Sequence, residues 1–266
     1  MSPSDSQKLK KVVEYMKSHW PSQVKPEWQV SLDEYPAIAK KVIQDFTAQK
    51  TKTRQFVRIA GLSGSGKTTQ ILPAVEAYSK KYGINPILIA ARRFVEYHPH
   101  YQEIKDFYGD QNLRKMTDEF ATIMMFIILT NLIEAGCDII LDVTLLDLSM
   151  EEILMSMLKK EKYQTLLLMI ATSPTVTEHF LGGRAWRHTK ATEQEFIRAT
   201  TQALDFYAKN HGDMRIILWS VYDQDPIYDG PVKDSLDIFN DYSSRETLPK
   251  PDDAERAEAK IRYLTA

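Results

Sequence analysis

The stretch that decides the fold is FVRIAGLSGSGKTT, residues 56–69. Its first half is a short apolar run, which predicts a buried strand over 56–61. Its second half satisfies the pattern G-x-x-x-x-G-K-[ST] and leads into a helical pattern over 67–80. Glycines in such a turn let the backbone approach a ligand closely, and the N–H groups that begin a helix face anions. The stretch therefore predicts a phosphate-binding loop between a strand and a helix.

We expect this loop to bind ATP or GTP together with Mg²⁺. The Lys67 ammonium would reach the β and γ phosphates, and the Thr68 hydroxyl would ligate the metal. The other residues expected to contact the nucleotide are Gly61, Ser63, Gly64, Ser65, Gly66 and Thr69. The alternative is a glycine-rich turn without a ligand, which the flanking strand and helix make the weaker reading.

The rest of the chain alternates strand-like and helix-like segments. Apolar runs predict strands over 86–90, 137–144, 165–172 and 215–220, and helical periodicity predicts helices over 118–135, 151–160 and 192–210. The expected fold is therefore α/β, a P-loop kinase-like parallel sheet of about five strands with helices on both faces. Residues 1–50 would form an N-terminal helical extension, 51–230 the kinase-like domain, and 231–266 a polar C-terminal segment with a helix over 252–264.

Composition narrows the functional class. The 266 residues carry 34 Lys and Arg against 36 Asp and Glu, so the overall charge indicates neither a nucleic-acid nor a membrane partner. The single cysteine, Cys137, excludes an intrachain disulfide and fits a reducing cytosol. The apolar run from Ile123 is shorter than the roughly 20 residues that span a bilayer, and the N-terminus lacks the apolar core of a signal peptide. We expect a cytoplasmic protein that acts on a small molecule.

Residues later in the chain suggest phosphoryl transfer. Arg184 and Arg187 follow the fourth strand, where small P-loop kinases have lid arginines that neutralise the transferred group. The alternative is that they lie on a solvated helix face. Asp142 lies near the carboxyl end of the third predicted strand, and the carboxyl ends of parallel strands meet at the ligand crevice. It could hold Mg²⁺ through water or orient an acceptor hydroxyl, or it could be a cap or turn residue.

The order of these motifs resembles the zeta toxins of bacterial toxin–antitoxin systems, over roughly residues 55–228. The matching pieces are GLSGSGKT, F-x-x-x-HPHY, AGCDIILDVT, LLMIAT and RAWRHTKATEQEF. Zeta toxins are P-loop kinases that phosphorylate the 3′-hydroxyl of the sugar in UDP-N-acetylglucosamine. The resemblance thus implies such a nucleotide sugar, or a similar small anionic acceptor, as substrate, and an antitoxin as partner. It places Asp142 and Thr144 at the acceptor sugar, and Arg184 and Arg187 in the lid.

The stretch LIAARRFVEYHPHY, residues 88–101, both supports the resemblance and departs from it. Phe94 and the His98-Pro99 pair match, but the family's strand ends in Asp-x-Asp, whose second aspartate is the catalytic base. Here those positions are Ala90 and Arg92, and an arginine cannot accept a proton. Arg92 and Arg93 could instead bind an anionic acceptor by forked contacts. His98 could bond to a ligand or act as a structural cap.

Two classes of function stay open on this sequence. One is an active zeta-like kinase with Lys67, Asp142, Arg184 and Arg187 as catalytic residues, and Thr68 and Asp142 as metal ligands. Its acceptor would contact Arg92, Arg93, His98 and Thr144. The other is a catalytically silent nucleotide-binding protein that acts through a partner, and a small-molecule or polynucleotide kinase of the same fold is a third reading. Lys67 and the arginines favour the first, because a silent fold has little use for them.

Overall fold

The computed structural model describes residues 13–14, 17–18, 22–47, 51–62, 65–67, 71–81, 83–143, 148–173, 190–220 and 226–245. The chain divides into two compact units. The first unit comprises residues 1–52 and 87–137, and the second comprises residues 53–86 and 138–266. The phosphate-binding loop predicted from the sequence thus belongs to the second unit.

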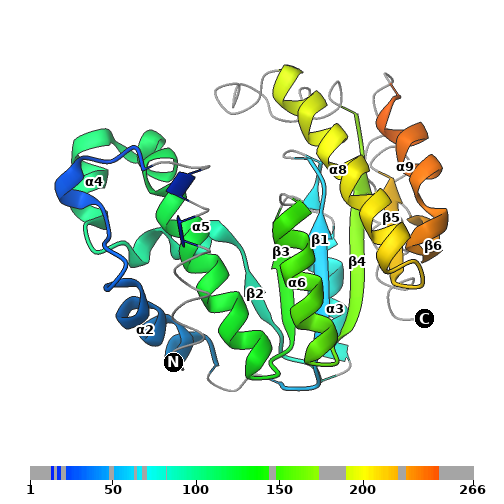
Figure 1. Cartoon of the computed structure of the whole chain (residues 1–266), viewed down its shortest axis with the longest axis horizontal. Coiled ribbons are helices and arrows are strands. Elements are labelled where there is room, and N and C mark those ends of the chain that lie inside the picture. Colours follow the sequence, from blue (N-terminus) through cyan, green and yellow to red (C-terminus); the bar gives the residue numbers. More distant parts are fainter. Residues whose placement is uncertain are drawn as a thin grey trace. The chain divides into compact units, whose positions relative to one another are not determined.

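The second unit is built on a sheet with the strand order β3-β1-β4-β5-β6 (Figure 1). The central strand β1 (Gln55–Ala60) pairs in parallel with β3 (Ile139–Asp142) and with β4 (Gln164–Ala171). β4 also pairs in parallel with β5 (Arg215–Ser220), whereas β6 (Pro226–Pro231) runs antiparallel to β5. The α/β class is confirmed. The antiparallel strand was not predicted, because PIYDGP contains two prolines and no apolar alternation.

Helices cover both faces of this sheet. α6 (Leu148–Lys160) and α8 (Lys190–Asn210) lie over one face, and α3 (Leu72–Lys81) lies behind the strands in the same view (Figure 1). A short helix, η4 (Val232–Asp234), and α9 (Leu236–Ser243) follow β6. Covered strands have to be apolar on both sides, which is why β3, β4 and β5 end in continuous buried runs.

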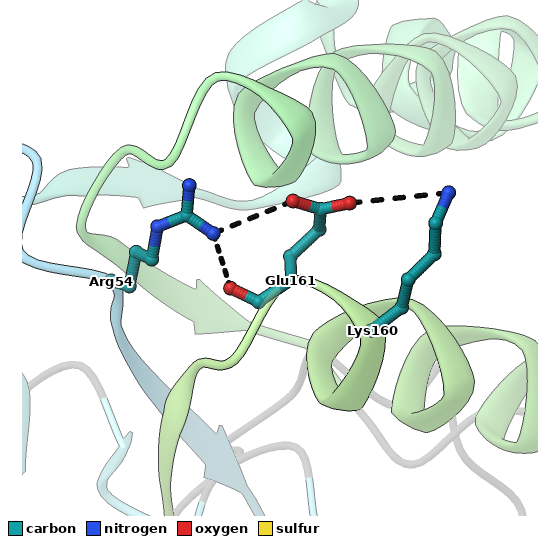
Figure 2. A network of polar contacts seen from close by, with 3 residues as sticks. All are labelled: Arg54, Lys160 and Glu161. Atoms are coloured by element: carbon teal, nitrogen blue, oxygen red, sulfur yellow. Dashed lines mark hydrogen bonds and ion pairs between the residues drawn. The ribbon is translucent and has the colours of Figure 1, made fainter.

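Polar contacts fix the amino end of the sheet, opposite the phosphate-binding loop. The buried Asp138 carboxylate accepts hydrogen bonds from the backbone N–H and hydroxyl of Thr53, both at 2.9 Å, and from the Gln55 N–H at 2.8 Å. Nearby, Arg54 donates to the carbonyl and the carboxylate of Glu161, and Lys160 lies 4.0 Å from the second carboxylate oxygen (Figure 2). These contacts anchor the start of β1, so that its other end presents the loop in a defined place.

The first unit is largely helical. Its elements are η1 (Pro26–Trp28), α2 (Tyr35–Thr47), β2 (Ile87–Ile89), η3 (Ala91–Tyr97), α4 (Tyr101–Tyr108) and α5 (Asp110–Glu134). The buried Tyr35 of α2 stacks on Phe120 of α5, with ring centroids 5.7 Å apart. Part of the N-terminal extension therefore packs into the core of this unit.

Helix α5 is longer than the sequence pattern predicts. It begins eight residues before the predicted start at residue 118, directly after Gly109, whose φ is +76°. By length and composition α5 alone, among the helices of the described ranges, could cross a membrane. However, 67% of its most apolar window is buried inside the protein, as expected of a core helix.

Candidate functional site

The phosphate-binding loop begins at Gly61, directly after the last residue of β1. The φ of Gly61 is +149° and that of Gly66 is +93°, values that favour glycine. A Cβ on Gly61 would also stand 2.9 Å from the Ser65 hydroxyl and 3.2 Å from the Ile170 Cβ. Gly61 is therefore required both for its backbone conformation and for the close approach of Ser65 and β4.

The Lys67 ammonium points back over the start of this loop. Its Nζ donates hydrogen bonds to the carbonyl oxygens of Gly61 and Leu62, each at 2.7 Å. The side chain is half-buried, so the cation is held close to the backbone and keeps access to solvent. A bound phosphate offers this ammonium a stronger, charged acceptor than a neutral carbonyl. The arrangement suits a lysine that exchanges loop carbonyls for phosphate oxygens.

Asp142 lies at the carboxyl end of the strand next to β1. It is the last residue of β3 and pairs with Ile59 of β1, two residues before Gly61. Its side chain is buried. Within the described ranges no three His, Cys, Asp or Glu side chains are grouped closely enough to hold a metal ion. A Mg²⁺ site formed by Asp142 and Thr68 together with phosphate oxygens and water stays a prediction, and few protein ligands are usual for Mg²⁺.

Three more polar residues lie at or directly after the carboxyl ends of buried strands, and the sequence analysis missed them. Thr172 and Ser173 come directly after β4, and Ser220 is the last residue of β5. All three are at least 98% buried. A hydroxyl residue at the end of an apolar run could have indicated this position, because the carboxyl ends of parallel strands meet at one edge of the sheet.

A buried cluster of three polar side chains joins β1 to α6 and α8, and the sequence analysis missed this cluster as well. The Arg58 guanidinium pairs with the Glu151 carboxylate of α6 and lies 3.4 Å from the hydroxyl of Tyr207 on α8. Tyr207 also donates a hydrogen bond to Glu151. Burial opposes the charge on Arg58, yet Glu151 and Tyr207 outweigh it and raise the pKa of this guanidinium. The signal was an arginine inside the apolar strand FVRIA.

Three of the residues predicted to contact the acceptor, Arg92, Arg93 and His98, lie in the first unit, in and directly after η3. Arg93 donates to the Leu88 carbonyl at 2.7 Å, and its guanidinium lies 4.8 Å from the centre of the Phe46 ring. Arg92 is exposed. Arg93 thus has a structural role in this unit, and an acceptor role for both arginines stays a prediction.

His98 makes structural contacts just before α4. Its Nδ1 accepts a hydrogen bond from the backbone N–H of His100 at 3.1 Å, just before α4 begins. Its ring packs edge-on against the Phe120 ring, with ring centroids 4.6 Å apart. Burial lowers the pKa of His98 to about 4. The ring is therefore neutral at pH 7. A contact between His98 and a ligand stays a prediction.

Some predicted site residues lie outside the described residues. They are Ser63, Gly64, Thr68 and Thr69 of the loop, Thr144 after β3, and the lid arginines Arg184 and Arg187. The predicted C-terminal helix over 252–264 lies outside them as well.

Comparison with known proteins identifies the family. Residues 39–224 match the family model of the zeta toxins, which is well over half of the chain. The chain belongs to the zeta toxin family. A curated relative, Toxin PezT of Streptococcus pneumoniae serotype 4 (strain ATCC BAA-334 / TIGR4), is 28% identical over 143 residues, which are 53% of this chain and 54% of PezT. The chain thus matches about half the length of that relative.

A solved structure supports the same fold. A chain from the PezAT chromosomal toxin–antitoxin system of Streptococcus pneumoniae superimposes with a TM-score of 0.64 at 20% sequence identity. The match covers 89% of this chain and 98% of that chain. The chain therefore shares the fold of this solved chain over nearly all of the solved chain's length.

The end of β2 carries no acidic side chain. Ala90 directly follows β2 and is buried, and Arg92 lies in η3 with its side chain exposed. Neither residue can serve as a base. Lys67 and the Asp142 carboxylate that ends β3 are present in the second unit, whereas Ala90 and Arg92, which the sequence analysis matched to the family's Asp-x-Asp, offer no carboxylate.

Proposed function

We propose that this protein is an ATP- and Mg²⁺-dependent phosphotransferase of zeta toxin type, which acts on a hydroxyl of a nucleotide sugar or a similar small anionic acceptor. The observation that carries the proposal is the juxtaposition of Lys67 and Asp142 at the carboxyl ends of the paired strands β1 and β3. A cation and a carboxylate are placed there beside a loop whose glycine cannot be replaced without strain.

Phosphoryl transfer needs few covalent partners from the protein. The acceptor oxygen would bond to the γ-phosphorus while the bond to the bridging oxygen of the departing ADP breaks, and the hydroxyl proton would leave to a nearby base or to water. Lys67 would neutralise charge that spreads over the phosphate oxygens in this step. Asp142 would orient the acceptor hydroxyl or help to hold Mg²⁺ through water, and the ion would supply positive charge that polarises the phosphates when bound. Loss of a strong base slows such a reaction without abolishing it, because its transition state is loose.

The direct test measures ADP release from Mg²⁺-ATP in the presence of a panel of nucleotide sugars and dinucleotides. We expect release that depends on one acceptor class. Lys67→Ala should weaken ATP binding by about 10- to 100-fold, the value of a charge-assisted contact. The matched control is Lys80→Ala, which changes an exposed lysine of α3 and should leave binding unchanged.

A variant of Asp142 tests the second half of the site. Asp142→Asn keeps the size of the side chain and removes its charge, so ATP-dependent phosphorylation should fall at least about tenfold, the effect of weakening one charged contact. The affinity for ATP without metal should stay unchanged, because Lys67 and the loop are intact. An Asp142→Asn variant that phosphorylates the acceptor at the wild-type rate would show that Asp142 has no part in the reaction.

A second candidate function is favoured by Ala90 and Arg92. A silent nucleotide-binding protein would bind ATP through Lys67 and release no ADP with any acceptor. Arg92→Asp distinguishes the two readings, because a gain of sugar-nucleotide kinase activity would indicate a site that retains the rest of the zeta machinery. No gain, together with an inert wild type, would favour the silent protein.

Similarity to Toxin PezT and to the PezAT system supports an antitoxin partner in the proposal. Expression of this chain alone should then inhibit growth of a bacterial host, and Lys67→Ala should relieve the inhibition. Co-expression of the protein encoded next to it should restore growth of the host that carries the wild type. A host that expresses the wild-type chain without a partner protein and grows at full rate would argue against a toxin.

A further inference from the structure

Two buried hydroxyl groups near the phosphate-binding loop have no hydrogen-bond partner among the described residues. They are Oγ1 of Thr172 and Oγ of Ser65, whose residues are 2% and 0% exposed. A buried hydroxyl without a partner costs about 1–3 kcal/mol relative to a satisfied one, so such groups are rare in native proteins. The pair therefore points to a ligand that satisfies them when it binds.

The Ser65 hydroxyl lies close to Gly61, and Thr172 follows the strand that passes beside this glycine. The Ser65 hydroxyl is 2.9 Å from the position that a Cβ on Gly61 would occupy, and the carbonyl oxygen of Ile170 is 3.3 Å from the same point. β1 and β4 pair up to Ala60 and Met169, so the loop leaves β1 beside the last residues of β4. Thr172 is the first residue after β4. The alternation of the strand, continued from Ile170 to Thr172, turns the Thr172 side chain to the face on which Gly61 lies.

The chemistry of these groups selects an anion. Each hydroxyl can donate one hydrogen bond, and the Lys67 ammonium lies over the same glycine, at 2.7 Å from its carbonyl oxygen. A phosphate oxygen accepts several hydrogen bonds at once and carries a negative charge that a loop carbonyl does not. We propose that the Thr172 hydroxyl donates a hydrogen bond to a phosphate oxygen of the bound nucleotide. This inference rests on the proposed nucleotide binding and adds a residue after β4 to it.

The test uses the full chain and Mg²⁺-ATP. Thr172→Val replaces the hydroxyl with a methyl group of nearly the same size. Without nucleotide it should not lower the thermal midpoint and should raise it by up to about 2–4 °C, because a buried hydroxyl without a partner is removed. Its dissociation constant for ATP should increase about 10- to 100-fold, the equivalent of one hydrogen bond to a charged group. Thr172→Ser, which keeps the hydroxyl, should stay within about threefold of the wild type.

Thr200 provides a matched control. Thr200 on α8 is 1% exposed, and its hydroxyl also has no partner among the described residues. Thr200→Val should stabilise the free protein in the same way and leave the ATP dissociation constant unchanged. Should Thr172→Val fail to fold, Thr172→Ala removes the same hydroxyl and should show the same loss of affinity.

The possible failures are distinguishable. Wild-type protein that does not bind ATP overturns the proposed function and this inference with it. Wild-type protein that binds ATP, beside a Thr172→Val variant of equal affinity, overturns the inference alone.

Discussion

Replacing Arg58 tests how the second unit is held together. Arg58→Met leaves the Glu151 carboxylate fully buried, with the Tyr207 hydroxyl as its neighbour. Removing one member of a buried ion pair typically costs about 3–5 kcal/mol, because the remaining charge is uncompensated. For a domain of this size such a loss lowers the thermal midpoint by about 6–20 °C.

The assay is urea and thermal unfolding of four proteins: the wild type, Arg58→Met, Glu151→Met and the double variant. The double variant should lose less stability than Arg58→Met alone, since both charges are then replaced by apolar side chains. The coupling energy between the two sites should be at least about 2 kcal/mol. Arg54→Met is the matched control, since Arg54 pairs with Glu161 on the surface with 43% of its side chain exposed, and should cost about 1 kcal/mol or less.

Two results would refute this reasoning. One is an Arg58→Met variant that loses no more stability than Arg54→Met. The other is a double variant whose loss equals the sum of the two single losses, because independent sites add and members of one ion pair do not.

Two further predictions concern the backbone of the loop and the cap before α4. Gly61→Ala should lower the unfolding free energy by about 2–4 kcal/mol, because of strain at positive φ and the clash with Ser65. Gly109→Ala, which has open space around its Cβ, should cost about 1–2 kcal/mol. Equal losses of the two variants in thermal unfolding would contradict the clash. His98 titrates near 6.5 when unfolded and near 4 when folded, so the unfolded state takes up its proton first and stability falls as the pH drops from 6.5 to 4. Between pH 7 and pH 4.5 the wild type should lose about 2–3 kcal/mol more than His98→Asn, which keeps a cap acceptor; parallel pH profiles would show that His98 does not contribute.

The location of the phosphate-binding loop and of most strands followed from local sequence patterns. The apolar run before Gly61 became β1, and the run before Asp142 became β3, with the carboxylate at its end. Such signals are readable because burial on both faces forces a strand to be apolar throughout. Where the pattern is weak, as in PIYDGP, strand pairing with β5 decides the conformation and the sequence alone does not predict it.

The polar groups of the second unit show what a single sequence does not contain. The sequence has a charged residue, Arg58, inside an apolar strand, but it does not identify Glu151, 93 residues away, as the partner of Arg58. It placed Thr172 at the end of a strand without indicating that the hydroxyl would be buried there with no partner among the described residues. The spacing of apolar residues in the sequence indicates which positions are buried, because burial repeats with the period of the helix or strand. Which buried polar groups meet depends on how the elements pack, and only the tertiary structure decides that.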